Sequence, residues 1–132
     1  MPVFNNDILA ATREILIVSP FVTKRRATLM MQHLEIAIRN GTRVTVVTRP
    51  AEDYRETDQT ALQSTFTFMQ DTGVKMIFSS NIHQKFAVLD QKMVWYGSIN
   101  LLSFGSAEES IMRLESPVIA CELVKTVYNS HP

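Results

Sequence analysis

A histidine and a lysine two positions apart are the residues of this 132-residue chain whose types and spacing best suit chemistry. His83 and Lys85 open a short apolar run, and in a strand two such residues lie on the same face of the sheet. An imidazole acts as nucleophile or proton donor near neutral pH, and an ammonium neutralises phosphate charge. The pair therefore indicates a phosphate site.

A second polar cluster, Gly97-Ser98-Ile99-Asn100, ends the next apolar run. Ser98 and Asn100 share a face of that strand and can donate hydrogen bonds to phosphate oxygens, while Gly97 permits close approach of the backbone. Residues 90–92 read as a hairpin turn between the two strands. The hairpin would thus deliver four polar groups to one spot.

The elements that must position these groups alternate between strand and helix. Short apolar runs predict strands over 15–18, 43–48, 74–78, 85–89, 93–96 and 110–114. Helical periodicity predicts a short helix over 8–12, two longer helices ended by Gly41 and Gly73, and a last helix capped by Ser116. We expect one α/β domain over residues 1–132, with a mixed β-sheet flanked by helices on both faces.

The polar residues of the hairpin resemble the signature of the phospholipase D superfamily: His-x-Lys, four residues, Asp, six residues, Gly-Ser-x-Asn. The fixed positions match at His83, Lys85, Asp90, Gly97, Ser98 and Asn100, with both spacings intact. The resemblance is detailed over about twenty residues and extends in outline over nearly the whole chain. It implies a phospholipase D-like domain.

The resemblance also implies a mechanism that needs no metal or cofactor. One histidine attacks phosphorus to form a phosphohistidine, and a second protonates the leaving oxygen. Lys85 and Asn100 would hold the non-bridging oxygens, with Ser98 in support. A downstream glutamate orients the histidine in such enzymes; Glu109 is favoured here and Glu108 is the alternative. Asp90 is interpreted as structural, holding its own turn by local hydrogen bonds.

A single His-x-Lys supplies only one of the two histidines that this mechanism needs, because neither His33 nor His131 has a lysine two positions later. We therefore expect a homodimer with one composite site around a two-fold axis. Family members with one signature are mostly nucleases. The resemblance thus implies a phosphodiesterase, a hydrolase that cleaves DNA or RNA, with nucleic acid as partner and no membrane.

Two other functions stay open. One is a lipid phosphodiesterase or phosphatidyl transferase, and the other is a non-catalytic nucleic-acid-binding or dimerisation domain of a larger, helicase-type protein. Lys24, Arg25 and Arg26 read equally well as a solvated loop before a helix or as contacts to a phosphate backbone. Arg49 ends a strand, where α/β sheets bind ligands, and a salt bridge with Glu52 or Asp53 is at least as plausible.

Composition sets broad limits on function. Thirteen basic and thirteen acidic residues give no net charge, which argues against strong non-specific binding of nucleic acid over the whole surface. Cys121, the single cysteine, is expected to be a small buried hydrophobe. The sequence shows no signal peptide or membrane-spanning run, which predicts a cytoplasmic protein; a domain cut from a longer chain is also possible.

Overall fold

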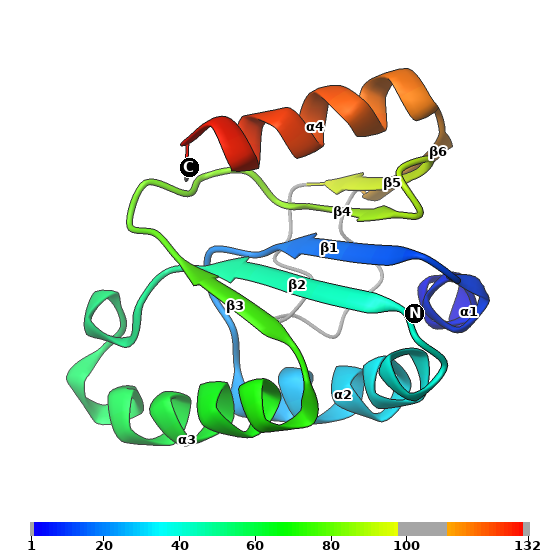
Figure 1. Ribbon diagram of the computed structural model, residues 1–132. Coiled ribbons are helices and arrows are strands. Elements are labelled where there is room, and N and C mark those ends of the chain that lie inside the picture. The colour runs from blue at the N-terminus through cyan, green and yellow to red at the C-terminus, as the bar shows by residue number, and fades with distance from the viewer. Residues whose placement is uncertain (1, 98–110, 131–132) are drawn as a thin grey trace.

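In a computed structural model that describes residues 2–97 and 111–130, six strands form one mixed sheet. The strands are β1 (Glu14–Val18), β2 (Arg43–Thr48), β3 (Lys75–Phe78), β4 (Phe86–Leu89), β5 (Met93–Gly97) and β6 (Ile111–Glu115). Their spatial order is β3-β2-β1-β4-β5-β6 (Figure 1). β1, β2 and β3 are parallel to one another, whereas β4, β5 and β6 are each antiparallel to the strand before them in that order.

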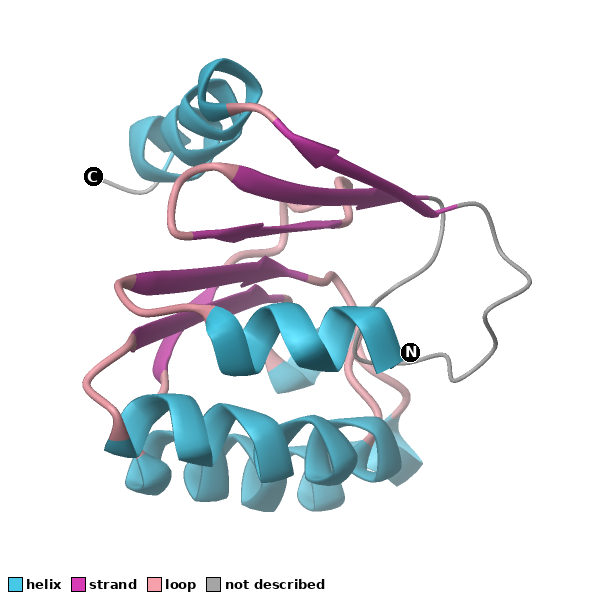
Figure 2. Ribbon diagram, turned by 90° about the vertical axis from the view of Figure 1, so that its right-hand side faces the viewer, coloured by secondary structure: helices cyan, strands magenta, loops and turns pink. Residues whose placement is uncertain are grey.

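Helices cover both faces of the sheet, as the sequence predicted. The helices are α1 (Pro2–Ala10), α2 (Lys24–Arg39), α3 (Glu56–Thr72) and α4 (Pro117–Ser130), with a short 3₁₀ turn η1 (Ala51–Asp53) before α3. Figure 2 shows α4 on the side of the sheet opposite to the other three helices. Within the described part of the chain, no helix has both the length and the apolar character required to cross a membrane.

Alternation along the strands divides the core between the two faces. In β1, Ile15 and Ile17 pack with the residues under α1, α2 and α3, while Leu16 and Val18 pack with those under α4. All four are at most 2% exposed. A strand covered on both faces reads as a continuous apolar run, which is why this segment has no polar alternation.

The first helix begins earlier than the sequence predicted. The expected helix is present, but its expected bounds of 8–12 are wrong, because α1 ends at Ala10 and already includes Phe4. Phe4 and Ile8 lie four residues apart on one helix face and are fully buried. Their burial fixes the position of the helix. Thr12, which was predicted to lie in this helix, instead donates its backbone N–H to Oδ2 of Asp90.

One polar cluster ties α1 to the far strands of the sheet. Asp7 accepts a hydrogen bond from Nε1 of Trp95 at 2.7 Å and forms an ion pair with Arg113, with 2.8 Å between Nε and Oδ2. The Arg113 contact is the main cause of the lowered pKa of Asp7, and the Trp95 bond adds to it against the opposing effect of burial. The indole also meets the ring of Phe4 edge-on, with 5.1 Å between centroids.

Two expectations about single residues also change. Lys24, Arg25 and Arg26 form the first turn of α2 rather than a loop, because Oγ1 of Thr23 accepts a hydrogen bond from the backbone N–H of Arg26 at 3.2 Å and caps the helix there. Cys121 is exposed rather than buried. The burial of α4 falls instead on neighbouring positions such as Ala120 and Val127.

Candidate active site

The sheet topology brings several strand ends to one edge. The parallel strands β1, β2 and β3 end there, and the antiparallel β4 begins there, with Phe86 opposite Val18. β5 runs back to the same edge, where the backbone N–H of Gly97 donates to the carbonyl of Lys85 at 3.4 Å. This edge lies where the chain switches from β3, on one side of β1, to β4 on the other, the usual ligand position of open α/β sheets.

His83 stands on this edge in the loop between β3 and β4, and it is exposed. The sequence predicted a strand from Lys85, but β4 begins at Phe86, so both motif residues precede it. β1, the strand that pairs with β4, ends at Val18, and the nearby Pro20 has no backbone N–H with which to continue the hydrogen-bonded ladder. The imidazole therefore leaves the sheet and is positioned by side-chain contacts.

Arg49 provides the contact that fixes the imidazole. Its Nη2 lies 3.3 Å from Nδ1 of His83 and donates to the carbonyl of Ile82 at 3.1 Å. A guanidinium only donates hydrogen bonds, so Nδ1 is the acceptor and the proton of the neutral ring sits on Nε2. In this arrangement the exposed ring of His83 carries its N–H at Nε2, while its Nδ1 lone pair is engaged by Arg49.

The same guanidinium makes two further contacts. Nη1 of Arg49 lies 3.8 Å from Oδ2 of Asp53, and its central carbon lies 5.3 Å from the centre of the Phe21 ring. Of the two interpretations left open by the sequence, the structure shows the salt bridge with Asp53 and also brings Arg49 to the motif histidine. Arg49 thus joins the loops that follow β1, β2 and β3.

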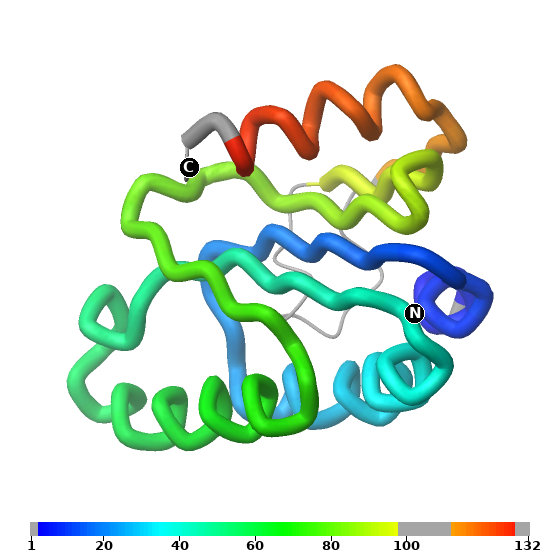
Figure 3. The backbone as a smooth tube through the Cα atoms, viewed as in Figure 1, coloured from blue at the N-terminus to red at the C-terminus, as the bar shows by residue number. Residues whose placement is uncertain are grey.

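A cavity of about 300 Å³ opens beside the imidazole on the face covered by α4. Its polar lining includes Asn81, His83 and Gln84, and its apolar lining includes Phe86 and Val127. The tube view shows the end of α4 close to the loop that carries His83 (Figure 3). A group bound to the histidine would thus have a partly apolar wall on one side.

Asp90 lies at the opposite end of β4 from the histidine. Oδ1 accepts hydrogen bonds from the backbone N–H groups of Arg13 at 2.8 Å and Glu14 at 3.0 Å, and Oδ2 accepts from that of Thr12 at 3.0 Å. Burial alone would raise its pKa, but these three bonds outweigh it and hold the pKa of Asp90 below its ordinary value. The carboxylate therefore links β1 to the hairpin. The expectation that it stabilises its own turn by local hydrogen bonds is wrong.

The hairpin turn itself matches the sequence prediction. Asp90 and Gln91 have φ of 53° and 57°, and the N–H of Lys92 donates to the carbonyl of Leu89 at 3.2 Å. Two successive positive φ angles define the turn type that suits the right-handed twist of paired strands. Aspartate tolerates this backbone conformation better than most residues.

The remaining motif residues fall outside the described part of the chain. These are Ser98, Asn100, Glu108 and Glu109. Gly97, the last residue of β5, lies beside Lys85, to whose carbonyl its backbone N–H donates. Among residues 2–97 and 111–130, no three histidine, cysteine or carboxylate side chains come together as a metal site would require.

The basic residues of α2 differ from one another in their surroundings. Lys24 and Arg25 are exposed, while Arg26 is partly buried, and burial lowers the pKa of its guanidinium. None of the three is shown in contact with His83. Their role as contacts to a phosphate backbone stays a prediction.

Sequence reasoning missed two aromatic residues at the same edge. Tyr54 accepts a hydrogen bond from the backbone N–H of Val22 at 2.8 Å and lies 3.2 Å from Oγ1 of Thr48, and burial raises its pKa. Phe21 packs edge-on against Tyr54, with 5.3 Å between centroids. Both follow the ends of strands, and that position was the available signal.

Comparison with known proteins agrees with this arrangement. A family model described as "Cardiolipin synthase, PLD-like domain" matches residues 5–129. No curated protein sequence matches the chain. The match covers almost the whole chain and confirms the resemblance that the polar motif suggested.

Solved structures share the fold at low sequence identity. Nuc, a phospholipase D family member from Salmonella typhimurium, superposes with a TM-score of 0.76 at 19% identity, over 97% of this chain and 84% of its own. NucT from Helicobacter pylori gives 0.72 at 18%, over 98% and 84%. TrmBL2, an archaeal chromatin protein, gives 0.65 at 12%, over 98% and 47%. The predicted mixed α/β fold is therefore confirmed.

Proposed function

Because the chain belongs to the phospholipase D superfamily, we propose that it is a metal-independent nuclease that cleaves DNA or RNA through a phosphohistidine in a homodimeric site. The observation that carries this proposal is the exposed imidazole of His83, held at Nδ1 by Arg49 on the ligand-binding edge of the sheet. The single His-x-Lys motif resembles the members of the superfamily that are mostly nucleases, and this resemblance favours a nucleic-acid substrate; Nuc and NucT share the fold.

In-line displacement at phosphorus needs a nucleophile and a proton donor on opposite sides. In the first step, Nε2 of one neutral His83 forms a bond to phosphorus while the bond from phosphorus to the leaving oxygen breaks. That oxygen takes the Nε2 proton of the second copy's His83, which begins the step as the imidazolium and ends it as the neutral ring. In the second step, water gives a proton back to that second imidazole and attacks phosphorus, and the N–P bond breaks. Each copy performs one role in a given turnover.

The two roles require different protonation states of the ring: the nucleophile is neutral with its lone pair on Nε2, and the proton donor is an imidazolium that carries a proton on both nitrogens. The Arg49 contact leaves the proton of a neutral ring on Nε2, so in either copy this contact must open before Nδ1 carries a proton. The nucleophilic copy needs a lone pair on Nε2, so its Nδ1–H must face an acceptor. We assign that acceptor to Glu109, with Glu108 as the alternative. Lys85 and Asn100 neutralise the non-bridging oxygens, and Ser98 supports them.

A cleavage assay in excess chelator tests the chemistry. We expect wild-type protein to cut plasmid and single-stranded oligonucleotides, and His83→Ala to reduce the rate by roughly 10³-fold or more, as for loss of an essential nucleophile or acid–base group. His33→Ala, a change of the same type in α2, serves as the matched control and leaves the rate unchanged. Cleavage that survives in His83→Ala would remove the histidine from the mechanism.

Mixing the two forms tests the composite site. The 15.0 kDa chain should elute as a species of twice that mass in light scattering. Adding an excess of the His83→Ala variant should then suppress wild-type activity, because each mixed dimer contains only one His83 imidazole instead of two. A strict monomer at micromolar concentration, or wild-type activity unaffected by an excess of the variant, contradicts the dimer.

Two other functions have one observation each in their favour. The matching family model takes its description from cardiolipin synthase, which favours a phosphatidyl transferase or lipid phosphodiesterase. The fold shared with TrmBL2, whose structure shows a mode of DNA binding, favours a non-catalytic binding domain. Head-group release from phosphatidylcholine or phosphatidylglycerol vesicles would support the first, and tight binding of oligonucleotide without turnover would support the second.

A further inference from the structure

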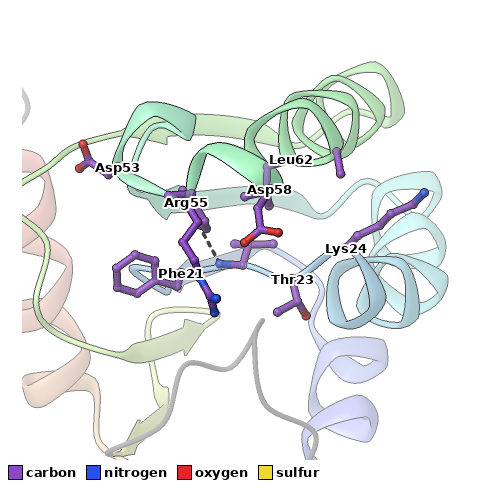
Figure 4. Close-up of a pocket in the computed structure, with 10 residues that line it drawn as sticks. Phe21, Thr23, Lys24, Asp53, Arg55, Asp58 and Leu62 are labelled. Atoms are coloured by element: carbon purple, nitrogen blue, oxygen red, sulfur yellow. Dashed lines mark hydrogen bonds between the residues drawn. The ribbon is translucent and has the colours of Figure 1, made fainter.

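A second cavity, of about 390 Å³, opens on the same edge of the sheet between the loop after β1 and the start of α3. Its lining includes Phe21, Thr23, Arg55, Asp58 and Leu62 (Figure 4). That volume lies within the range of about 300–1,000 Å³ usual for small-ligand sites.

The side chain of Arg49 connects this cavity with His83. Arg49 contacts Nδ1 of His83 with Nη2 at 3.3 Å, and its central carbon lies 5.3 Å from the ring centre of Phe21, which lines the cavity. A phosphate at His83 and a group in the cavity would therefore flank the same guanidinium. This is the relation of a phosphodiester to its own base or sugar.

Phe21 offers a fixed aromatic surface to that group. The ring is 39% exposed, yet its edge contact with Tyr54 holds it, with an interplanar angle of 82°. Tyr54 is fixed in turn by the hydrogen bond from the backbone N–H of Val22. A held, half-exposed ring is the usual platform for base stacking, which contributes about 1–3 kcal/mol per base.

Two opposite charges lie beside the ring. In Figure 4 the guanidinium of Arg55 and the carboxylate of Asp58 extend into the space next to Phe21, whereas Lys24 and Asp53 point away from it. Within residues 2–97 and 111–130, neither the Arg55 nor the Asp58 side chain has an ion pair or a hydrogen bond. A cavity into which a guanidinium and a carboxylate extend side by side suits a neutral group that carries both acceptors and donors.

Guanine is the base that matches this pair. Its N1–H and N2–H groups are adjacent donors that a carboxylate can accept together, and its O6 and N7 are the acceptors that arginine commonly binds. We propose that the cavity binds an unpaired guanine of the substrate, stacked on Phe21, with Asp58 on the N–H edge and Arg55 on O6. This inference rests on the nuclease function proposed above.

Asp58 also stands in the first turn of α3, where a carboxylate favours the helix regardless of any ligand. Glu56 shares that turn but does not line the cavity. Glu56→Gln is therefore the matched control for Asp58→Asn, since both remove one negative charge from the same helix end. Circular dichroism and thermal unfolding of each variant verify that it is folded.

Titration with the four nucleoside 5′-monophosphates and with phosphocholine, followed by calorimetry, tests the cavity directly. We expect GMP to bind wild-type protein about tenfold or more tightly than the others, and Asp58→Asn to remove that advantage, because a charge-assisted bidentate contact is lost. Phe21→Leu should weaken all four nucleotides, and Glu56→Gln should change none. Equal affinities for the four in wild-type protein, or tighter binding of phosphocholine than of GMP, overturns the proposal.

Mapping of cut positions in a mixed-sequence single strand separates this proposal from the proposed function. Wild-type protein should cut preferentially beside guanine, and the preference should flatten in Asp58→Asn but not in Glu56→Gln. Cleavage without any base preference refutes the guanine site while leaving the nuclease intact. Guanine-selective GMP binding without cleavage of any phosphodiester refutes the nuclease while leaving the cavity's selectivity in place.

Discussion

Removing the Asp90 carboxylate should weaken the fold more than its partial exposure suggests. In Asp90→Asn, one oxygen can still accept from Arg13 and Glu14 as a neutral acceptor, but an amide NH₂ can then face the N–H of Thr12. Hydrogen bonds to a charged group contribute about 1.5–3 kcal/mol each when well formed, and solvent screening reduces this. We expect a loss of about 1.5–2 kcal/mol in the free energy of unfolding.

The backbone at this position allows the contact to be separated from strain. At a φ of 53°, alanine costs roughly 1 kcal/mol more than glycine, since a β-carbon is disfavoured there. Asp90→Gly therefore reports loss of the carboxylate with little added strain, and Asp90→Ala reports both. Urea unfolding followed by far-UV circular dichroism measures all three variants against Glu35→Gln, an exposed carboxylate on α2.

The sign of the pH dependence follows from the lowered pKa of Asp90. A carboxylate whose pKa is lower in the folded state stabilises the fold above its unfolded pKa, and this contribution is lost as pH falls through the folded pKa. The gap between wild type and Asp90→Asn should therefore be full at pH 7 and shrink below about pH 4, near the ordinary aspartate pKa. A variant within 0.5 kcal/mol of wild type at pH 7, on the order of an ordinary surface change, would show that the three bonds are not stabilising.

Two further changes test the helix ends. In urea unfolding, Gly73→Ala should destabilise the protein by roughly 2 kcal/mol and Gly41→Ala by about 1 kcal/mol. Both glycines have positive φ, but only at Gly73 would an added β-carbon meet Cγ2 of Ile38, at 3.1 Å. Equal losses of stability in the two variants would exclude a role for that contact. Ser116→Ala should cost about 1 kcal/mol, because its Oγ accepts from the N–H of Ile119 at 3.2 Å at the start of α4, and Ser116→Asn should restore most of it; an unchanged midpoint for Ser116→Ala would show that this cap is dispensable.

The strands were predictable because their signal is local. The expected strand over 43–48 matches β2, and no end of the other described strands differs from expectation by more than one residue. An apolar run bounded by turn residues can be recognised as a strand without knowing which strand pairs with it. The hairpin turn at 90–92 likewise depends on its own backbone conformation. The alternation of strands with helices then sufficed for the fold class.

The contacts that define the site depend on which strands become neighbours, and no local pattern states this. Arg49 reaches His83 because β1 lies between β2 and β4, so that both residues leave the sheet at one edge. Asp90 reaches residues 12–14 because β4 pairs antiparallel with β1. The sequence supplied the chemical groups, whereas the pairing of distant strands determined their partners.

The position of the single tryptophan gives the protein an internal optical reporter. Trp95 lies on β5, next to the edge strand β6, yet the ring contact and the hydrogen bond of its indole are both with α1. Its emission wavelength consequently follows the docking of that one helix, while circular dichroism follows the whole chain. Comparing the two signals during unfolding distinguishes peeling of the N-terminal helix from cooperative loss of the domain, without any label.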